Sequence, residues 1–122
     1  MLQLEDLEVW KKSREFRNKV SALCKSFPSD EKYKLIDQMI RASRSITANI
    51  AEGYGRFHFQ ENIQYCRQAR GSITEMYDHL TVALDEGYIS QEQFNDYDTE
   101  VKFLLKLING YIAHLKKKKD EN

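Results

Sequence analysis

Acidic and histidine side chains that could share a proton or half of a metal site occur together at one place in the sequence. Glu75 and His79 are four residues apart, which places them one turn apart on a helix, and Asp78 stands next to His79. This group could serve a metal-dependent nuclease or another enzyme, although a solvent-facing ion pair is the commoner role of such residues. We therefore predict no catalytic residues, metal ligands or cofactors, and we keep an unrecognised enzyme as the alternative.

The sequence patterns of familiar catalytic sites are absent. A di-iron or di-manganese helical bundle needs Glu-x-x-His pairs, and no glutamate stands three residues before His58, His79 or His114. The chain also has no Gly-x-x-x-x-Gly-Lys phosphate loop and no nucleophile elbow. An enzyme would therefore need an unfamiliar arrangement of residues.

Basic side chains could give the protein a surface for phosphate groups. They occur in the predicted first helix and near the C-terminus: Lys11, Lys12, Arg14, Arg17, Lys19, Lys116, Lys117, Lys118 and Lys119. Lysine and arginine contacts, with the counterions they release, supply much of the affinity of a protein for a polyanion. The 19 basic and 19 acidic residues cancel, however, so total charge does not favour nucleic-acid binding. We predict a candidate surface for RNA or DNA, with a solvated helix face as the alternative.

Aromatic side chains near these basic residues give little support for base stacking. Stacking needs a ring that is open to solvent. Trp10, Phe16, Tyr54, Phe57 and Phe59 mostly fall on stripes that we expect to face a core. The sequence therefore favours core packing as the role of these rings.

Arg70 is the odd member of the apolar stripe of the predicted third helix, which also includes Ile73 and Tyr77. A buried charge is costly unless it is paired. We therefore expect Arg70 to meet a carboxylate, with Glu52 and Glu75 as the candidates. Such a pair would fix the second helix against the third. An arginine that faces a ligand or a subunit boundary is the alternative.

Four predicted amphipathic helices carry these side chains, at about residues 6–26, 30–54, 60–86 and 90–117. Apolar residues recur every three or four positions in each of them. We expect Asp6 to cap the first helix, and Ser90 to cap the last one together with Gln93. Because short connections make neighbouring helices antiparallel, we predict one domain over 1–122: an all-α, up-down-up-down four-helix bundle.

Small residues predict close packing around the second helix. Segment 41–56 combines apolar positions with residues that are small or able to hydrogen-bond, which suits a helix packed on more than one side. Gly53 and Gly55 are expected to end this helix in a left-handed conformation. Gly71, in the middle of the third helix, is expected to allow the close approach of a neighbouring backbone.

The sequence shows no signal for export or membrane insertion. Residues 1–6 lack the basic start and apolar run of a signal peptide, and no stretch approaches the roughly 20 apolar residues that cross a bilayer. Cys24 and Cys66 fall on apolar stripes, which favours two reduced core thiols over a disulfide. We therefore expect a cytoplasmic protein without a membrane partner.

Four blocks of the sequence together resemble a known family of four-helix bundle proteins. The blocks are DLEVW at 6–10, segment 41–56 with ANIAEGYGR at its centre, ARGSITE at 69–75 and GYIS at 87–90. Their order and spacing are similar to those of proteins encoded in intervening sequences of bacterial 23S ribosomal RNA. That family is related to the accessory variability determinant of diversity-generating retroelements. The likeness covers nearly the whole chain, although Thr47 stands where the family commonly has proline or alanine.

The resemblance implies a ring-shaped homopentamer with no established catalytic activity. It also implies RNA or DNA, and a reverse transcriptase or another protein, as candidate partners. Asn49, Glu52, Arg56, Arg70 and Glu75 belong to the shared blocks and are expected to be polar groups at the junction of the second and third helices. We accordingly predict a non-enzymatic, oligomeric four-helix bundle that acts as an interaction scaffold.

Overall fold

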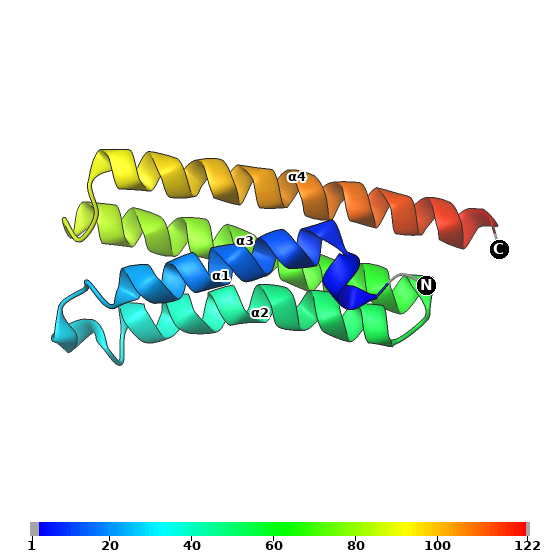
Figure 1. Ribbon diagram of the computed structural model, residues 1–122, viewed down its shortest axis with the longest axis horizontal. Helices are drawn as coiled ribbons and strands as arrows, with labels where there is room; N and C mark the ends of the chain where they lie inside the picture. Colours follow the sequence, from blue (N-terminus) through cyan, green and yellow to red (C-terminus); the bar gives the residue numbers. More distant parts are fainter. Residues whose placement is uncertain (1–2, 122) are drawn as a thin grey trace.

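The computed structural model describes residues 3–121. Its long helices run side by side along one axis (Figure 1). They are α1 (Glu8–Cys24), α2 (Leu35–Gly55), α3 (Phe59–Asp85) and α4 (Gln91–Glu121), with short 3-10 helices at Leu4–Asp6 and Ser29–Glu31. Successive helices point in opposite directions, and both ends of the chain lie at the same end of the bundle (Figure 1). The described residues contain no strand. The predicted all-α, up-down-up-down bundle is confirmed.

The helices pack in a ring that follows the order of the chain. α2 packs against α1 and α3, α3 packs against α4, and α1 closes the ring against α4. α2 therefore has packed neighbours on two sides, as the small residues of segment 41–56 predict. The seam between α1 and α4 is the least extensive of the four, so α1 is held mainly by α2.

Apolar side chains from every helix meet in one core. The predicted inward positions of α2, which are Met39, Ser43, Ile46 and Ile50, are all buried. Their spacing of three or four residues places them on one side of the helix. The hydrophobic pattern thus sets the orientation of α2 in the bundle.

The predicted stripe of α3 is wrong at two positions. Ala69 and Met76 are fully buried, whereas Arg70 is only partly buried and Tyr77 is 42% exposed. Each buried residue stands one position before the residue that we predicted to face the core. The small Ala69 and the flexible Met76 fill the space between the helices, and Arg70 lies at the edge of the core, where it reaches Asn109 of α4.

Gly53, Gly55 and Gly71 have other roles than the sequence predicts. α2 continues through Gly55, and the left-handed residue that follows it is Phe57, with a φ of 60°. A Cβ on Gly53 would lie 2.7 Å from Asn62 Oδ1 and 2.9 Å from Tyr65 Cβ, so α2 and α3 approach closely at Gly53. A Cβ on Gly71 would have no neighbour within 4 Å. The close approach exists, but at a different glycine.

Helix starts also depart from the prediction, because two 3-10 turns precede the regular helices. Asp6 lies in the first of these turns and accepts a hydrogen bond from the Gln3 amide at 3.0 Å, so it does not cap α1. α2 begins at Leu35 rather than near residue 30, and the Glu31 carboxylate accepts from the Leu35 amide at 3.3 Å.

The predictions for the end of α3 and the start of α4 are correct. Gly87 follows α3 with a φ of 76°. The Ser90 hydroxyl accepts from the Gln93 amide at 3.1 Å, and the Gln93 side chain accepts from the Ser90 amide at 2.9 Å. α4 then continues to Glu121, beyond the predicted residue 117.

Cys24 and Cys66 are free and buried, as predicted. Burial raises the pKa of the Cys24 thiol to about 11 and that of the Cys66 thiol to about 12. Both groups therefore remain neutral at physiological pH. Among the helices described here, none is both long enough and apolar enough to cross a membrane.

Candidate nucleic-acid interface

The predicted basic residues of α1 divide among three places on its surface. Lys12 and Lys19 line a groove between α1 and α4. Arg17 lines a groove between α1 and α2. Lys11 and Arg14 line a depression along α1 itself. These places differ in their acidic neighbours, and this difference decides which of them suits a phosphate group.

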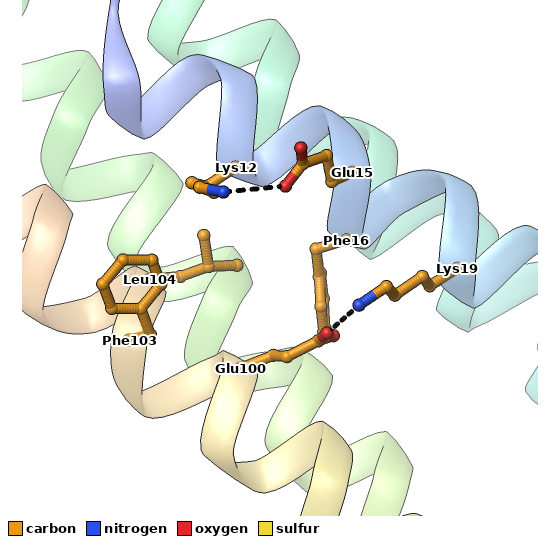
Figure 2. A pocket seen from close by; sticks show the side chains of 7 residues that line it. All are labelled: Lys12, Glu15, Phe16, Lys19, Glu100, Phe103 and Leu104. Carbon is orange, nitrogen blue, oxygen red and sulfur yellow. Dashed lines mark hydrogen bonds and ion pairs between the residues drawn. The ribbon is translucent and has the colours of Figure 1, made fainter.

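The groove between α1 and α4 has a volume of about 190 Å³ and is drawn in Figure 2. Its lining residues are Lys12, Glu15, Phe16 and Lys19 of α1, and Glu100, Phe103 and Leu104 of α4. Lys12 Nζ lies 3.3 Å from Glu15 Oε2. Lys19 donates a hydrogen bond to Glu100 across the groove, and this charged contact raises the pKa of Lys19. Because a carboxylate neutralises each lysine, this groove offers little to a phosphate.

The groove between α1 and α2 has a volume of about 360 Å³ and a lining without carboxylates. Its walls are Arg17, Asn18 and Ser21 of α1, and Ile40, Ser43 and Arg44 of α2. Arg17 Nη1 donates a hydrogen bond to Thr47 Oγ1 at 3.1 Å, and Thr47 Oγ1 donates to the Arg44 carbonyl oxygen at 3.2 Å. Neither arginine makes an ion pair within residues 3–121. Two guanidinium groups thus share a groove in which their charge is not cancelled.

Lys11 and Arg14 have acidic residues nearby. The Arg14 guanidinium carbon lies 5.8 Å from the centroid of the Trp10 ring, which is a cation–π contact. Glu5 and Glu15 line the same depression, which has a volume of about 400 Å³. The two basic groups are therefore weaker candidates for a phosphate than the arginines of the α1–α2 groove.

The four lysines near the C-terminus occupy the last turns of α4, at the end of the bundle marked C in Figure 1. Lys118 Nζ lies 3.6 Å from Glu121 Oε2, and Lys119 Nζ donates to Gln60 Oε1 at 2.6 Å. Successive residues of a helix point in different directions, so the four lysines do not all share one face. These lysines form a separate basic end rather than one surface with the arginines of α1.

Asn49 of α2 lies near the contact of α2 with α3. Its Nδ2 donates to the carbonyl oxygen and to the hydroxyl oxygen of Ser45, both at 2.9 Å. Ser45 Oγ lies 2.9 Å from Ser72 Oγ of α3. The amide therefore orients the hydroxyl that links the two helices.

Arg56 links the end of α2 to α3 in a second way. Its Nη2 donates to Tyr65 Oη at 2.9 Å, and its guanidinium carbon lies 5.3 Å from the centroid of the same ring. Nη2 is also 3.5 Å from Glu52 Oε1. Tyr65 thus holds Arg56 beside the α2–α3 connection.

Arg70 is turned toward α4 and does not meet either predicted carboxylate. Its Nη1 donates to Asn109 Oδ1 at 2.9 Å, so the expected pair with Glu52 or Glu75 is wrong. Glu75 Oε2 instead lies 2.9 Å from His79 Nε2. His79 is only 8% exposed, which corrects the expectation of a solvent-facing pair. In the part of the chain that the structure describes, no three His, Cys, Asp or Glu side chains are placed to hold a metal ion.

Sequence reasoning missed Arg44 and misjudged Phe57. Arg44 stands three residues before Thr47, so both lie on the face of α2 that meets α1, and this spacing was the available signal. Phe16 is buried, as predicted, but Phe57 is 86% exposed. Phe57 lies in a connection rather than in a helix, and helical periodicity does not apply there.

Comparisons with known proteins agree with this geometry at the level of the fold and the family. A family model described as 23S rRNA-intervening sequence protein matches residues 5–110. A crystal structure of a protein of unknown function from the S23 ribosomal protein family of Bacteroides thetaiotaomicron superposes with a TM-score of 0.79 and 25% sequence identity, covering 86% of this chain and 95% of that one. The curated proteins gave no match. The chain therefore belongs to the 23S rRNA-intervening sequence protein family.

Proposed function

We propose that this protein is a non-enzymatic, homo-oligomeric scaffold that binds RNA or DNA through phosphate contacts in the α1–α2 groove. The observation that carries the proposal is the pair Arg17 and Arg44, which line one groove without a carboxylate. A guanidinium group presents two parallel donors that match the oxygens of a phosphate. The bond to Thr47 holds the Arg17 side chain, which reduces the ordering that binding would require.

The expected affinity is modest and depends steeply on salt. The chain has a formal net charge of +0, so attraction to a polyanion has to come from local groups. Each phosphate that a basic group neutralises releases counterions, and the logarithm of the affinity falls with the logarithm of the salt concentration. The slope therefore reports how many basic groups take part.

A fluorescence anisotropy titration of labelled RNA and DNA across a range of salt tests the proposal. The double variant Arg17→Gln, Arg44→Gln should reduce the slope by about 1.4–1.8, at about 0.7–0.9 for each lost phosphate contact. The matched control, Lys12→Gln with Lys19→Gln on the other side of α1, should leave the slope nearly unchanged. Absence of binding to either nucleic acid at low salt would overturn the proposal.

Assembly and partners form the second part of the proposal. Membership of the family supports a cyclic homo-oligomer, with a pentamer as the expected number, and a reverse transcriptase or another protein as a further partner. Two buried free thiols are compatible with a reducing compartment, and we place the protein in the cytoplasm on that ground. Light scattering at high protein concentration tests the assembly, and a monodisperse monomer would contradict it.

A further inference from the structure

A cleft lined by aromatic rings lies at the end of the bundle where α2 is connected to α3, and its volume is about 310 Å³. Four phenyl or phenol rings and two imidazole rings contribute to its lining: Tyr54, Phe57, His58, Phe59, Tyr111 and His114. The lining contains no carboxylate. Only the fold brings the α2–α3 connection and α4 together here, so the sequence gives no direct sign of this cleft.

Phe57 occupies the left-handed position that follows α2, and its ring is exposed to solvent. Its φ of 60° lies in the left-handed region, which costs a residue with a Cβ roughly 1–2 kcal/mol. Its side chain is 86% exposed, so the folded chain gains almost no burial from the ring. Glycine would end the helix without this cost, so helix termination does not account for a large apolar ring at this position. The ring is therefore placed for a partner rather than for the core.

The inner wall of the cleft is held in place. Asn62 Nδ2 donates to Tyr111 Oη at 3.1 Å. The ring of Tyr111 stacks with that of His114, with the planes inclined by 17° and the centroids 6.5 Å apart. Burial raises the pKa of Tyr111, so its hydroxyl stays neutral at physiological pH. The neutral, hydrogen-bonded Tyr111 ring suits the flat face of another ring.

Basic residues are close in the chain to residues that line the cleft. Arg56 precedes Phe57 in the chain, and Lys118 follows His114 by one helical turn, on the same side of α4. Lys119 donates to Gln60 and so fixes the last turns of α4 against the start of α3. Arg56 and Lys118 also have carboxylate partners, Glu52 at 3.5 Å and Glu121 at 3.6 Å, so the rings of the lining rather than these cations distinguish the cleft. Such rings match the flat bases of a nucleic acid. A duplex does not fit, because its base faces are covered by stacking.

We propose that this cleft receives one unstacked base of a single-stranded nucleic acid, with Phe57 as the stacking ring. The inference rests on the function proposed above and adds the place where a base is bound. It distinguishes two contributions to binding: phosphate contacts at Arg17 and Arg44, and stacking at Phe57. Stacking does not depend on the charge of the strand, so it confers a preference for single strands without changing the response to salt.

Binding of one labelled RNA, alone and annealed to its complement, tests the inference in the intact protein. Phe57→Ala should weaken single-strand binding roughly tenfold, or about 1.4 kcal/mol, while duplex binding and the salt slope stay unchanged. Phe57→Tyr should retain the preference. The matched control is Tyr33→Ala, because Tyr33 is 83% exposed but does not line the cleft. Phe57→Gly, which relieves the backbone strain, should be as stable as the parent in thermal unfolding and still lose the preference.

Several outcomes would overturn the inference. Equal losses for single strand and duplex in Phe57→Ala, no loss in either, or an equal loss in Tyr33→Ala would each contradict base stacking at this cleft. In all three cases the phosphate groove would remain supported by the salt slope of the arginine variants. Absence of binding by the parent protein would instead overturn the proposed function, and the base site with it.

Discussion

The seam between α2 and α3 and the seam between α1 and α4 are built in different ways. At the first, Gly53 brings the backbone of α2 against Asn62 and Tyr65 of α3, with no room for a methyl group. At the second, a groove of about 190 Å³ separates the helices, and the ion pair of Lys19 with Glu100 spans it. One seam is closely packed, whereas the other leaves a groove that an exposed ion pair spans.

This difference follows from the order of the chain. α2 and α3 are joined by a short connection, 56–58, so they are always near one another. α1 and α4 are the first and last helices, and only the folding of the whole bundle brings them together. Exposed ion pairs contribute little stability. The contact between α1 and α4 is therefore the weakest of the four contacts between neighbouring helices. We expect the bundle to open first along this seam.

The largest expected effect is at the closed seam. In Gly53→Ala the new Cβ would collide with Asn62 Oδ1 at 2.7 Å and would lie 3.1 Å from the Asn62 carbonyl oxygen. Backbone has to move, and we expect the free energy of unfolding to fall by about 2–3 kcal/mol. The midpoint of thermal unfolding, followed by circular dichroism, should fall by roughly 10 °C. An unchanged midpoint would show that this seam is not closely packed.

The next effect concerns Cys66, whose Sγ lies 3.5 Å from Asn62 Oδ1. Burial raises the pKa of Cys66 from 9.0 to about 12. Its contribution to stability is therefore complete below pH 9 and is lost as the pH rises toward 12, because the unfolded chain releases the proton first. In urea unfolding between pH 9 and 11, the parent should lose about 1.4 kcal/mol per pH unit more than Cys66→Ala. Parallel pH dependences in the two proteins would contradict a buried neutral thiol.

Alanine in place of a glycine without close neighbours should have a smaller effect, and it should increase stability. Neither Gly71 nor Gly110 has a neighbour within 4 Å of its Cβ position, and both lie inside helices. Gly71→Ala and Gly110→Ala should each raise the free energy of unfolding by about 0.5–1 kcal/mol. Chemical denaturation of these variants and of Gly53→Ala would compare the free energies of unfolding at glycines with and without a close neighbour. A loss of stability would show that these positions have a close neighbour.

The smallest effect is expected at the open seam. The Lys19 side chain is 57% exposed, so water screens its pair with Glu100. Lys19→Gln should change the free energy of unfolding by less than about 1 kcal/mol. A double-mutant cycle with Glu100→Gln measures the coupling, which should shrink in high salt. A coupling of several kcal/mol would show that this pair, rather than packing, closes the bundle.

Much of the fold could be predicted because it depends on patterns within each helix. The recurrence of Met39, Ser43, Ile46 and Ile50 indicates both the helix and its buried face. Gly53 lies on the same face, three residues after Ile50, so its close packing could also have been predicted. The starts of the helices were harder to predict, because hydrophobic periodicity does not show which short segments form a 3-10 turn.

The candidate site was harder to predict, because its residues are selected by neighbours from distant parts of the sequence. Lys12 and Lys19 resemble Arg17 in the sequence, yet a carboxylate of α1 itself neutralises Lys12 and Glu100 of α4 neutralises Lys19. The importance of Arg44 depends on the packing of α2 against α1. A sequence shows which residues are charged, and the fold determines which charges are cancelled.

Both ends of the chain lie at the same end of the bundle, and this is also the end of the α2–α3 connection (Figure 1). An affinity tag, a fluorescent protein or a solid support attached at either terminus would therefore crowd the aromatic cleft and could hide a bound strand. The opposite end, where Phe27 of the first connection contacts Tyr88 of the third at 5.3 Å between ring centroids, offers a safer point of attachment. A label placed at the exposed Tyr33 would report on the protein from a distance and leave the cleft open.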